Sequence, residues 1–159
     1  MKKSSTKFGF SVIEVVISVG ILLAIVVAVS IALQTFLQLS RHTSDVTQAT
    51  LLLEEGAEAL LIMRDLDWDT NIDSLSLNTP YSFHWNGSAY AFSVSPVTID
   101  GKYRREVVFE EFRRDGNGVP DDNGDVDDNT LLARISVYLV ADDSLLGTAN
   151  SLVHNSYDE

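Results

Sequence analysis

The 159-residue chain has no cysteine, only three prolines and few basic residues, and these shortages narrow what it can be. Without cysteine there are no disulfides and no thiolate metal sites, although this does not fix the compartment. Eleven Lys and Arg stand against 23 Asp and Glu, which gives a formal net charge of −12. Phosphate contacts need clustered basic residues, so the composition argues against a nucleic-acid contact.

The sequence also lacks the patterns that accompany catalysis. Its histidines, His42, His84 and His154, are scattered, and no nucleophile has a recognisable base nearby in the sequence. There is no phosphate-binding glycine loop and no Gly-x-Ser-x-Gly turn. We therefore expect a protein that is not an enzyme and has no catalytic residues.

One long apolar run stands near the N-terminus. From Phe10 to Leu33 the only formal charge is Glu14, and the run can span a bilayer core of about 30 Å as a helix. It is too long for an ordinary secretory signal. Lys2, Lys3 and Lys7 precede it, and the positive-inside rule places such a cluster in the cytoplasm. We expect a single-pass membrane protein with a cytoplasmic N-terminus and an extracytoplasmic C-terminal domain.

The acid near the start of this run needs an explanation. A carboxylate inside a membrane span costs roughly 2.5–3.5 kcal/mol at the bilayer centre, so Glu14 needs a partner or a task unless it lies at headgroup depth. The string KFGFSVIE, residues 7–14, combines a basic leader, a Gly-Phe junction and a Glu four residues later, directly before an apolar helix. It resembles the processing site of type IV pilins and type II secretion pseudopilins.

The resemblance implies that a membrane prepilin peptidase cleaves between Gly9 and Phe10 and methylates the new amine of Phe10. Gly9 and Phe10 would then be the processing residues, and Phe10 and Glu14 the assembly residues. In a filament, the Glu14 carboxylate of one subunit would face the Phe10 amine of a neighbour. Two opposite charges in a low dielectric attract strongly, but each also pays for desolvation, so we expect the pair to select the register more than to add stability.

A single helix from about Phe10 to about Leu66 is expected, because no Pro or Gly interrupts residues 40–44, where Thr43 or Ser44 could otherwise cap a separate second helix. Its second half is amphipathic. The predicted apolar stripe consists of Val46, Ala49, Leu53, Gly56, Leu60 and Met63.

The stretch ATLLLEEGAEALLIMRDLDW, residues 49–68, resembles a second pattern of many pilin-like proteins, Glu-Glu-Gly-x-Glu-Ala followed by Arg-Asp-x-x-Trp. Ile31 stands where many major pilins have a kinking Pro, and there is no cysteine pair. These departures favour a minor pilin or pseudopilin over a major pilin.

From Thr79 onward the pattern changes to the alternation that is typical of strands. Asn86-Gly87 lies between two such runs and predicts a hairpin with a two-residue loop. Five aromatic side chains then share one face, and we expect that face to cover the helix stripe instead of forming an exposed ligand platform. The predicted cross-strand pairs are Trp85 with Ser88, Phe83 with Tyr90 and Tyr81 with Phe92. Residues 86–88 also fit an N-glycosylation sequon, which the turn by itself explains.

Further strands of an antiparallel sheet are predicted at about Tyr103–Phe112, Leu131–Val140 and Thr148–His154. Between the first two lies an acidic loop, Arg113–Thr130, whose Gly, Pro, Asn and Asp content is typical of turns.

This loop holds the metal-ligand candidates of the chain. A true EF-hand is excluded, because Val126 replaces the required Gly and Leu132 stands at the position of the bidentate Glu. Some pseudopilins hold calcium in a loop of the sheet, so an irregular Ca²⁺ site competes with a solvated acidic loop. The candidate ligands are Asp115, Asn117, Asp121, Asn123 and Asp125. No other cofactor is expected.

The sequence thus predicts an α+β, pilin-like fold in which a long N-terminal helix packs on a small antiparallel sheet. The expected segments are a leader, 1–9, a transmembrane and assembly helix, 10–33, its amphipathic extension, 34–68, and an extracytoplasmic β domain, 69–159. We expect a structural subunit of a type IV pilus or type II secretion-like filament. Its partners would be prepilin peptidase, other pilin subunits, an inner-membrane assembly platform and lipid. The alternative is a single-pass anchored binding or adhesion protein that does not polymerise.

Overall fold

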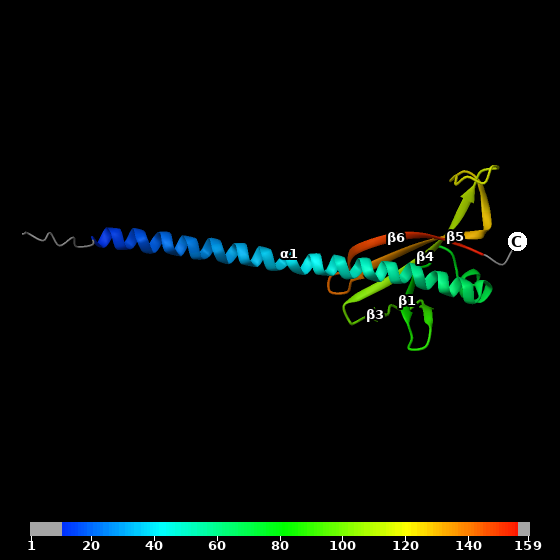
Figure 1. The fold of residues 1–159 in the computed structure, drawn as a ribbon, viewed down its shortest axis with the longest axis horizontal. Coiled ribbons are helices and arrows are strands. Elements are labelled where there is room, and N and C mark those ends of the chain that lie inside the picture. Colours follow the sequence, from blue (N-terminus) through cyan, green and yellow to red (C-terminus); the bar gives the residue numbers. More distant parts are fainter. Residues whose placement is uncertain (1–10, 156–159) are drawn as a thin grey trace, which may run out of the picture. The chain divides into compact units, whose positions relative to one another are not determined.

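The computed structural model describes residues 11–155, in which a helix comes first and strands follow. Helix α1 spans Val12–Leu66, and a short π-helical turn, η1, spans Asp69–Asp73. The strands are β1 Tyr81–Trp85, β2 Tyr90–Ser93, β3 Thr98–Ile99, β4 Tyr103–Arg114, β5 Asp125–Leu139 and β6 Ser144–His154 (Figure 1). The expected α+β fold, with one long N-terminal helix and a small antiparallel sheet, is confirmed.

The chain forms two compact units, residues 1–43 and residues 44–159. The described part of the first unit is the N-terminal part of α1. The second unit contains the rest of α1, η1 and the whole sheet. Its strands are all antiparallel and lie in the order β2-β1-β4-β5-β6, with β3 also paired to β4.

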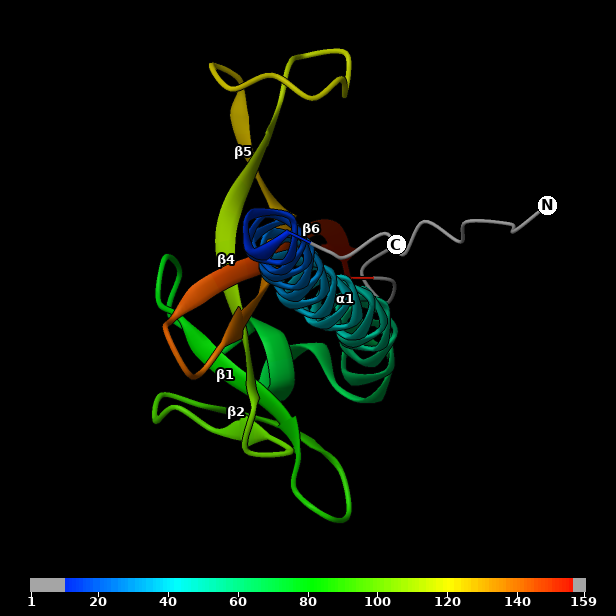
Figure 2. The ribbon, with the colours of Figure 1, turned by 90° about the vertical axis from the view of Figure 1, so that its left-hand side faces the viewer.

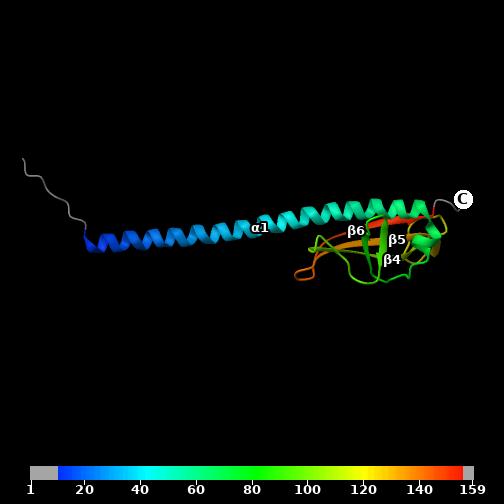
Figure 3. The ribbon, with the colours of Figure 1, turned by 90° about the horizontal axis from the view of Figure 1, so that it is seen from below.

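One face of this sheet is packed and the other is partly open to solvent. Along β4, Tyr103, Arg105, Val107 and Phe109 are buried, while the residues between them are only half-buried. This alternation is typical of an antiparallel sheet that packs on one side. Figure 3 shows the second half of α1 lying along the sheet.

The second half of α1 buries a narrow apolar stripe against the sheet. Of the predicted stripe, Val46 is 37% exposed and Leu53 is partly buried. Leu52 and Ala59 are buried in addition, because the line of contact alternates steps of three and four residues along the helix. The buried helix residues are Ala49, Leu52, Gly56, Ala59, Leu60 and Met63.

A charged side chain lies inside the contact between helix and sheet. Arg105 of β4 is 1% exposed, and its Nη1 donates a hydrogen bond to the Leu52 carbonyl at 2.8 Å. Its Nε donates to the Phe83 carbonyl at 3.2 Å, and its Nη2 pairs with the Glu55 carboxylate at 3.3 Å. A Cβ on Gly56 would lie only 3.1 Å from Cδ of Arg105, so the glycine provides the room for the arginine.

The β1–β2 hairpin forms where it was predicted, but its register differs. Trp85 pairs with Tyr90 and Phe83 with Phe92, so the loop has four residues, 86–89. The predicted two-residue loop and its pairs are therefore wrong. Because the shift is two residues and side chains alternate with a period of two, the same side chains still share a face. The rings of Phe83 and Phe92 stack with their centroids 4.9 Å apart.

The four-residue loop is explained by the side chain of Asn86. Its Oδ1 accepts hydrogen bonds from the backbone N–H of Ser88 at 3.0 Å and of Ala89 at 3.1 Å. Its own N–H donates to the Ala89 carbonyl. The asparagine therefore closes a wider turn than the type I′ turn that the Asn-Gly pair suggested.

The aromatic face of the hairpin covers the helix, as expected. Tyr81 and Phe83 are buried in the same cluster as the helix residues, whereas Trp85 remains 55% exposed. The Tyr90 hydroxyl donates to the Glu55 carboxylate at 3.1 Å. Burial, together with this hydrogen bond, raises the pKa of Tyr90.

The acidic loop is shorter than predicted. Strand β4 continues to Arg114 and β5 begins at Asp125, so the loop covers residues 115–124 instead of 113–130. Beyond a bulge, Arg113 pairs with Val126, which extends the two strands past the rest of the sheet. Figure 2 shows this extension, which we call the acidic arm, residues 111–129.

We expect Gly56→Val to destabilise the second unit. The added methyl groups would have to displace Arg105, and overpacking of this kind costs about 1–3 kcal/mol. Denaturant unfolding of the full-length protein in detergent, followed by tryptophan fluorescence, measures the shift because Trp68 is buried.

Gly20→Val is the matched control, since a Cβ at Gly20 meets nothing within 4 Å in the described chain. It should leave the unfolding midpoint unchanged. Equal midpoints for the two variants would contradict the role assigned to Gly56.

Candidate functional site

The N-terminal part of α1 carries an apolar surface that the described chain does not cover. Every Val, Ile, Leu and Phe from Val12 to Leu39 exposes between 50% and 80% of its side chain. The helix is long and apolar enough to cross a membrane. Water is a poor solvent for so much apolar surface, so this part of the helix is compatible with a membrane span.

The hydroxyl side chains within this surface are satisfied by the helix itself. The hydroxyls of Ser18, Ser30 and Thr35 each donate to the carbonyl four residues earlier. Such bonds let Ser and Thr reside in an apolar environment without another partner. The carboxylate of Glu14 cannot be satisfied in this way, because it accepts hydrogen bonds and cannot donate one to a carbonyl.

Glu14 lies in the first turn of α1 and is exposed. Within residues 11–155 its carboxylate contacts no cationic group or hydrogen-bond donor, and the hydroxyl of Ser18 bonds to its main-chain carbonyl instead. The predicted processing residues Gly9 and Phe10 lie outside the described residues. The structure therefore places one of the three predicted processing and assembly residues.

The loop of the acidic arm is held by its own backbone. Asp115 accepts hydrogen bonds from the N–H groups of Val119 at 2.8 Å and Asn117 at 2.9 Å, and these bonds lower the pKa of its carboxyl. Asp121 accepts in the same way from Asn123. These aspartates therefore act as turn residues in the structure.

Three of the calcium candidates carry carboxylates, Asp115, Asp121 and Asp125. Among residues 11–155 no group of three or more His, Asp or Glu side chains is placed to hold a metal ion. Asp125 begins strand β5 and pairs with Arg114, so it belongs to the ladder and not to the loop. The Ca²⁺ hypothesis thus gains no geometric support and does not enter the proposed function.

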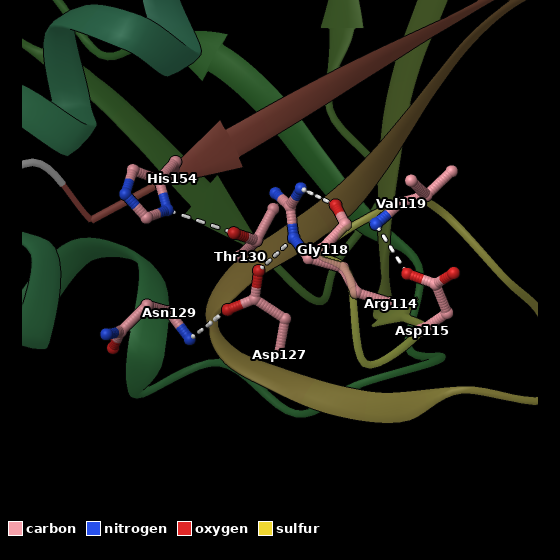
Figure 4. A network of polar contacts seen from close by, with 8 residues as sticks. All are labelled: Arg114, Asp115, Gly118, Val119, Asp127, Asn129, Thr130 and His154. Atoms are coloured by element: carbon pink, nitrogen blue, oxygen red, sulfur yellow. Dashed lines mark hydrogen bonds and ion pairs between the residues drawn. The ribbon is translucent and has the colours of Figure 1, made fainter.

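A polar network connects the base of the arm to the end of β6 (Figure 4). The Nε of Arg114 donates to the Asp127 carboxylate at 2.6 Å, and its Nη1 donates to the Gly118 carbonyl at 3.1 Å. Thr130 then joins the network to the ring of His154, with 2.9 Å between Oγ1 and Nδ1. The network ties the loop to the sheet.

Close backbone contact at Gly124 completes the arm. A Cβ there would lie 2.1 Å from the Arg114 carbonyl oxygen, so only glycine fits. The roles of Arg114, Asp127 and Thr130 could not be predicted from the sequence, because the ion pair and the bond to His154 each join residues from two different strands. The only hint in the sequence was that two Arg residues precede the turn and Asp residues follow it.

An apolar groove lies in the second unit, beside the hairpin loop. It has a volume of about 330 Å³ and is open on one side to the exposed ring of Trp85. Its lining residues are Ile62, Met63, Leu66, Asn71, Trp85, Ser88, Ala89 and Tyr90.

Comparisons of the chain with protein-family models, curated proteins and solved structures found no match.

We expect Asp127→Asn to loosen the loop of the arm. Arg114 holds the pKa of the Asp127 carboxyl below its usual value. A lowered pKa in the folded state contributes stability above the unfolded pKa of about 3.9, and this contribution is lost as the pH falls through the lowered value. Asparagine removes the charge, so at neutral pH the amides of residues 115–124 should lose about fivefold in hydrogen-exchange protection, or about 1 kcal/mol.

The lowered pKa of Asp127 also predicts the direction in which hydrogen-exchange protection changes with pH. In the wild type, protection corrected for intrinsic exchange rates should fall as the medium is acidified below about pH 4, and in the variant it should change less. Asp122→Asn is the control, because Asp122 is exposed and its carboxylate makes no hydrogen bond or ion pair within the described chain. Equal losses in the two variants would show that Asp127 has no special role.

Proposed function

We propose that the protein is a filament subunit of the minor pilin or pseudopilin kind, made as a membrane-anchored precursor and assembled through the N-terminal part of α1. The observation that carries this proposal is the apolar surface from Val12 to Leu39, which residues 11–155 leave uncovered, with an acid at its beginning, Glu14, that has no partner among the same residues. A permanent membrane anchor explains the apolar surface but gives no reason for the acid.

The energetics favour two successive environments for this surface. Full burial of one Val, Leu, Ile or Phe side chain is worth about 1.5–3 kcal/mol. The cost of exposing the eighteen side chains of these types between Val12 and Leu39 to water would therefore exceed the free energy of unfolding of a small domain. Lipid covers them in the membrane. Neighbouring helices cover them in a filament, where van der Waals contact between small and branched residues replaces the lipid.

The energetic effect of Glu14 differs between lipid and a filament. In lipid Glu14 carries only a cost, unless it reaches the headgroups. In a filament, cleavage after Gly9 would supply the amine of Phe10 on an adjacent subunit as its partner. The resemblance of residues 7–14 to prepilin processing sites supports this pairing, and the second resemblance, over residues 49–68, supports the same family.

The second unit is the part that a filament would display. Its helix contributes Gly56 and Glu55, and its sheet contributes the buried Arg105 that fills the space left by the glycine. This contact explains the Glu-Glu-Gly part of the second motif in physical terms. The required partners are a prepilin peptidase, an assembly platform in the membrane, lipid and further subunits.

We expect Gly9→Trp to block the shortening of the precursor. A peptidase that accepts glycine beside the scissile bond has no room for an indole ring, so the variant should keep its leader. Immunoblots of host membranes measure the size. Ser11→Ala, on the other side of the junction, is the control and should be shortened normally. If the wild type itself is never shortened in cells that contain a prepilin peptidase, the permanent anchor is favoured.

Glu14→Ala should leave the amount of protein in the membrane unchanged and remove it from sheared filaments. Alanine lowers the cost of membrane insertion but cannot meet a neighbouring amine. Quantitative blots of the membrane and sheared fractions give the ratio, and we expect a loss of more than tenfold. Ser18→Ala, one turn further along, removes only a hydroxyl that bonds to its own helix, and it should assemble like the wild type. Normal assembly of Glu14→Ala would refute the pairing.

A second candidate function is a single-pass anchored binding protein. The observation in its favour is the apolar groove beside Trp85, a residue with 55% of its side chain exposed. Such a protein would use α1 only as an anchor, and neither Gly9 nor Glu14 would then affect its location.

A further inference from the structure

One motif of the sequence has no part in assembly. Asn86-Gly87-Ser88 is the only Asn-x-Ser/Thr triplet in the chain in which the middle residue is not proline. It lies in the loop between β1 and β2, and residues 85–89 are all exposed. Since β2 is the edge strand of the sheet, no further strand of the described chain pairs with it on this side of the loop.

The loop holds the carboxamide of Asn86 in one orientation. Its Oδ1 accepts three hydrogen bonds, from the N–H of Ser88 at 3.0 Å, the hydroxyl of Ser88 at 3.0 Å and the N–H of Ala89 at 3.1 Å. Two of these donors are backbone N–H groups, which only an oxygen can accept, so the positions of O and N in the amide are fixed by the network.

The same network leaves the other end of the amide available. A carboxamide is planar, so fixing Oδ1 toward the loop turns Nδ2 away from it. Within residues 11–155, Nδ2 donates to no group, and the residue is exposed. A turn needs only the oxygen of Asn86. The nitrogen and the hydroxyl of Ser88 are what an N-glycosylation acceptor requires.

We propose that Asn86 is an N-glycosylation site whose substrate is a lipid-linked oligosaccharide, transferred by an oligosaccharyltransferase. A bond forms between Nδ2 and the anomeric carbon of the first sugar. The bond from that carbon to the phosphate oxygen of the lipid carrier breaks, and the phosphate leaves with the electron pair. One proton of Nδ2 passes to a base on the transferase. No oxidation or reduction is involved.

This inference rests on the extracytoplasmic placement of the second unit in the proposed function, because such transfer takes place on that side of the membrane. The position also suits the fold. The contact of Arg105 with Leu52 and Glu55 lies between the helix and the sheet, whereas Asn86 lies in an exposed loop, so a glycan would leave that contact undisturbed.

The test uses the full-length protein purified from the membranes of its native host. Trypsin cuts after Arg64 and Lys102, so one peptide carries Asn86, and mass spectrometry of that peptide should show a sugar increment. Enzymatic release of the glycan in heavy-oxygen water should convert Asn86 into a labelled aspartate. A parallel sample in the same water without the enzyme separates this conversion from spontaneous deamidation at Asn86-Gly87, which incorporates the label as well.

Three variants test the role of the loop. Asn86→Gln and Ser88→Ala should lose the increment completely, whereas Ser88→Thr, which keeps the hydroxyl, should retain it. Unfolding midpoints equal to that of the wild type show that the variants fold. An increment that survives in Ser88→Ala would overturn the proposed acceptor, and so would a bare Asn86 in the wild type.

Protease treatment of intact cells separates this failure from a failure of the proposed function. A second unit that is digested from outside but carries a bare Asn86 refutes the glycosylation site and leaves the topology standing. A protected second unit with a bare Asn86 refutes both.

Discussion

The constraint on which the protein depends is an apolar helix surface that the described part of its own chain, residues 11–155, does not cover. Most proteins of this size bury their branched apolar side chains in one core. Here those from Val12 to Leu39 stay half or more exposed, while those of the second unit form an ordinary core around Leu60 and Phe83. The surface therefore requires partners of its own kind, lipid or other helices, and this requirement separates the first unit from the second.

The second unit depends on a different constraint. Its helix and sheet make close contact around a buried charged side chain. A buried guanidinium is costly unless it is paired and hydrogen-bonded, and Arg105 donates to two carbonyls and one carboxylate. Glycine at position 56 is what allows this arrangement, despite its low helix propensity. Gly56 and Arg105 together therefore fix the position of the helix on the sheet, whereas a purely apolar contact would allow the helix to shift along it.

Much of the fold could be predicted from the sequence because it depends on local periodicity. The helix, the three long strands and the shared aromatic face follow from steps of three and four residues and from alternation. The register of the hairpin could not be predicted in this way. It depends on hydrogen bonds from two backbone N–H groups to the side chain of Asn86, which close a four-residue loop, and the periodicity of the sequence does not reveal such bonds. The loop of the arm was predicted too long because its aspartates disfavour strands by propensity, whereas pairing with Arg113 and Arg114 overrides that preference. The buried Arg105 was missed because charged side chains are almost never fully buried, although the alternation places it on the packed face with Tyr103 and Val107.

We propose above all that Glu14 pairs with the ammonium group that cleavage would create on Phe10 of a neighbouring subunit. The chemical state of the N-terminus tests this pairing most directly. Mass spectrometry of the protein taken from filaments of its native host would identify that terminus. We expect a chain that begins at Phe10 with a methylated amine. A chain that still carries Lys2, Lys3 and Lys7 would contradict the claim, because Glu14 would then have no new ammonium group to meet.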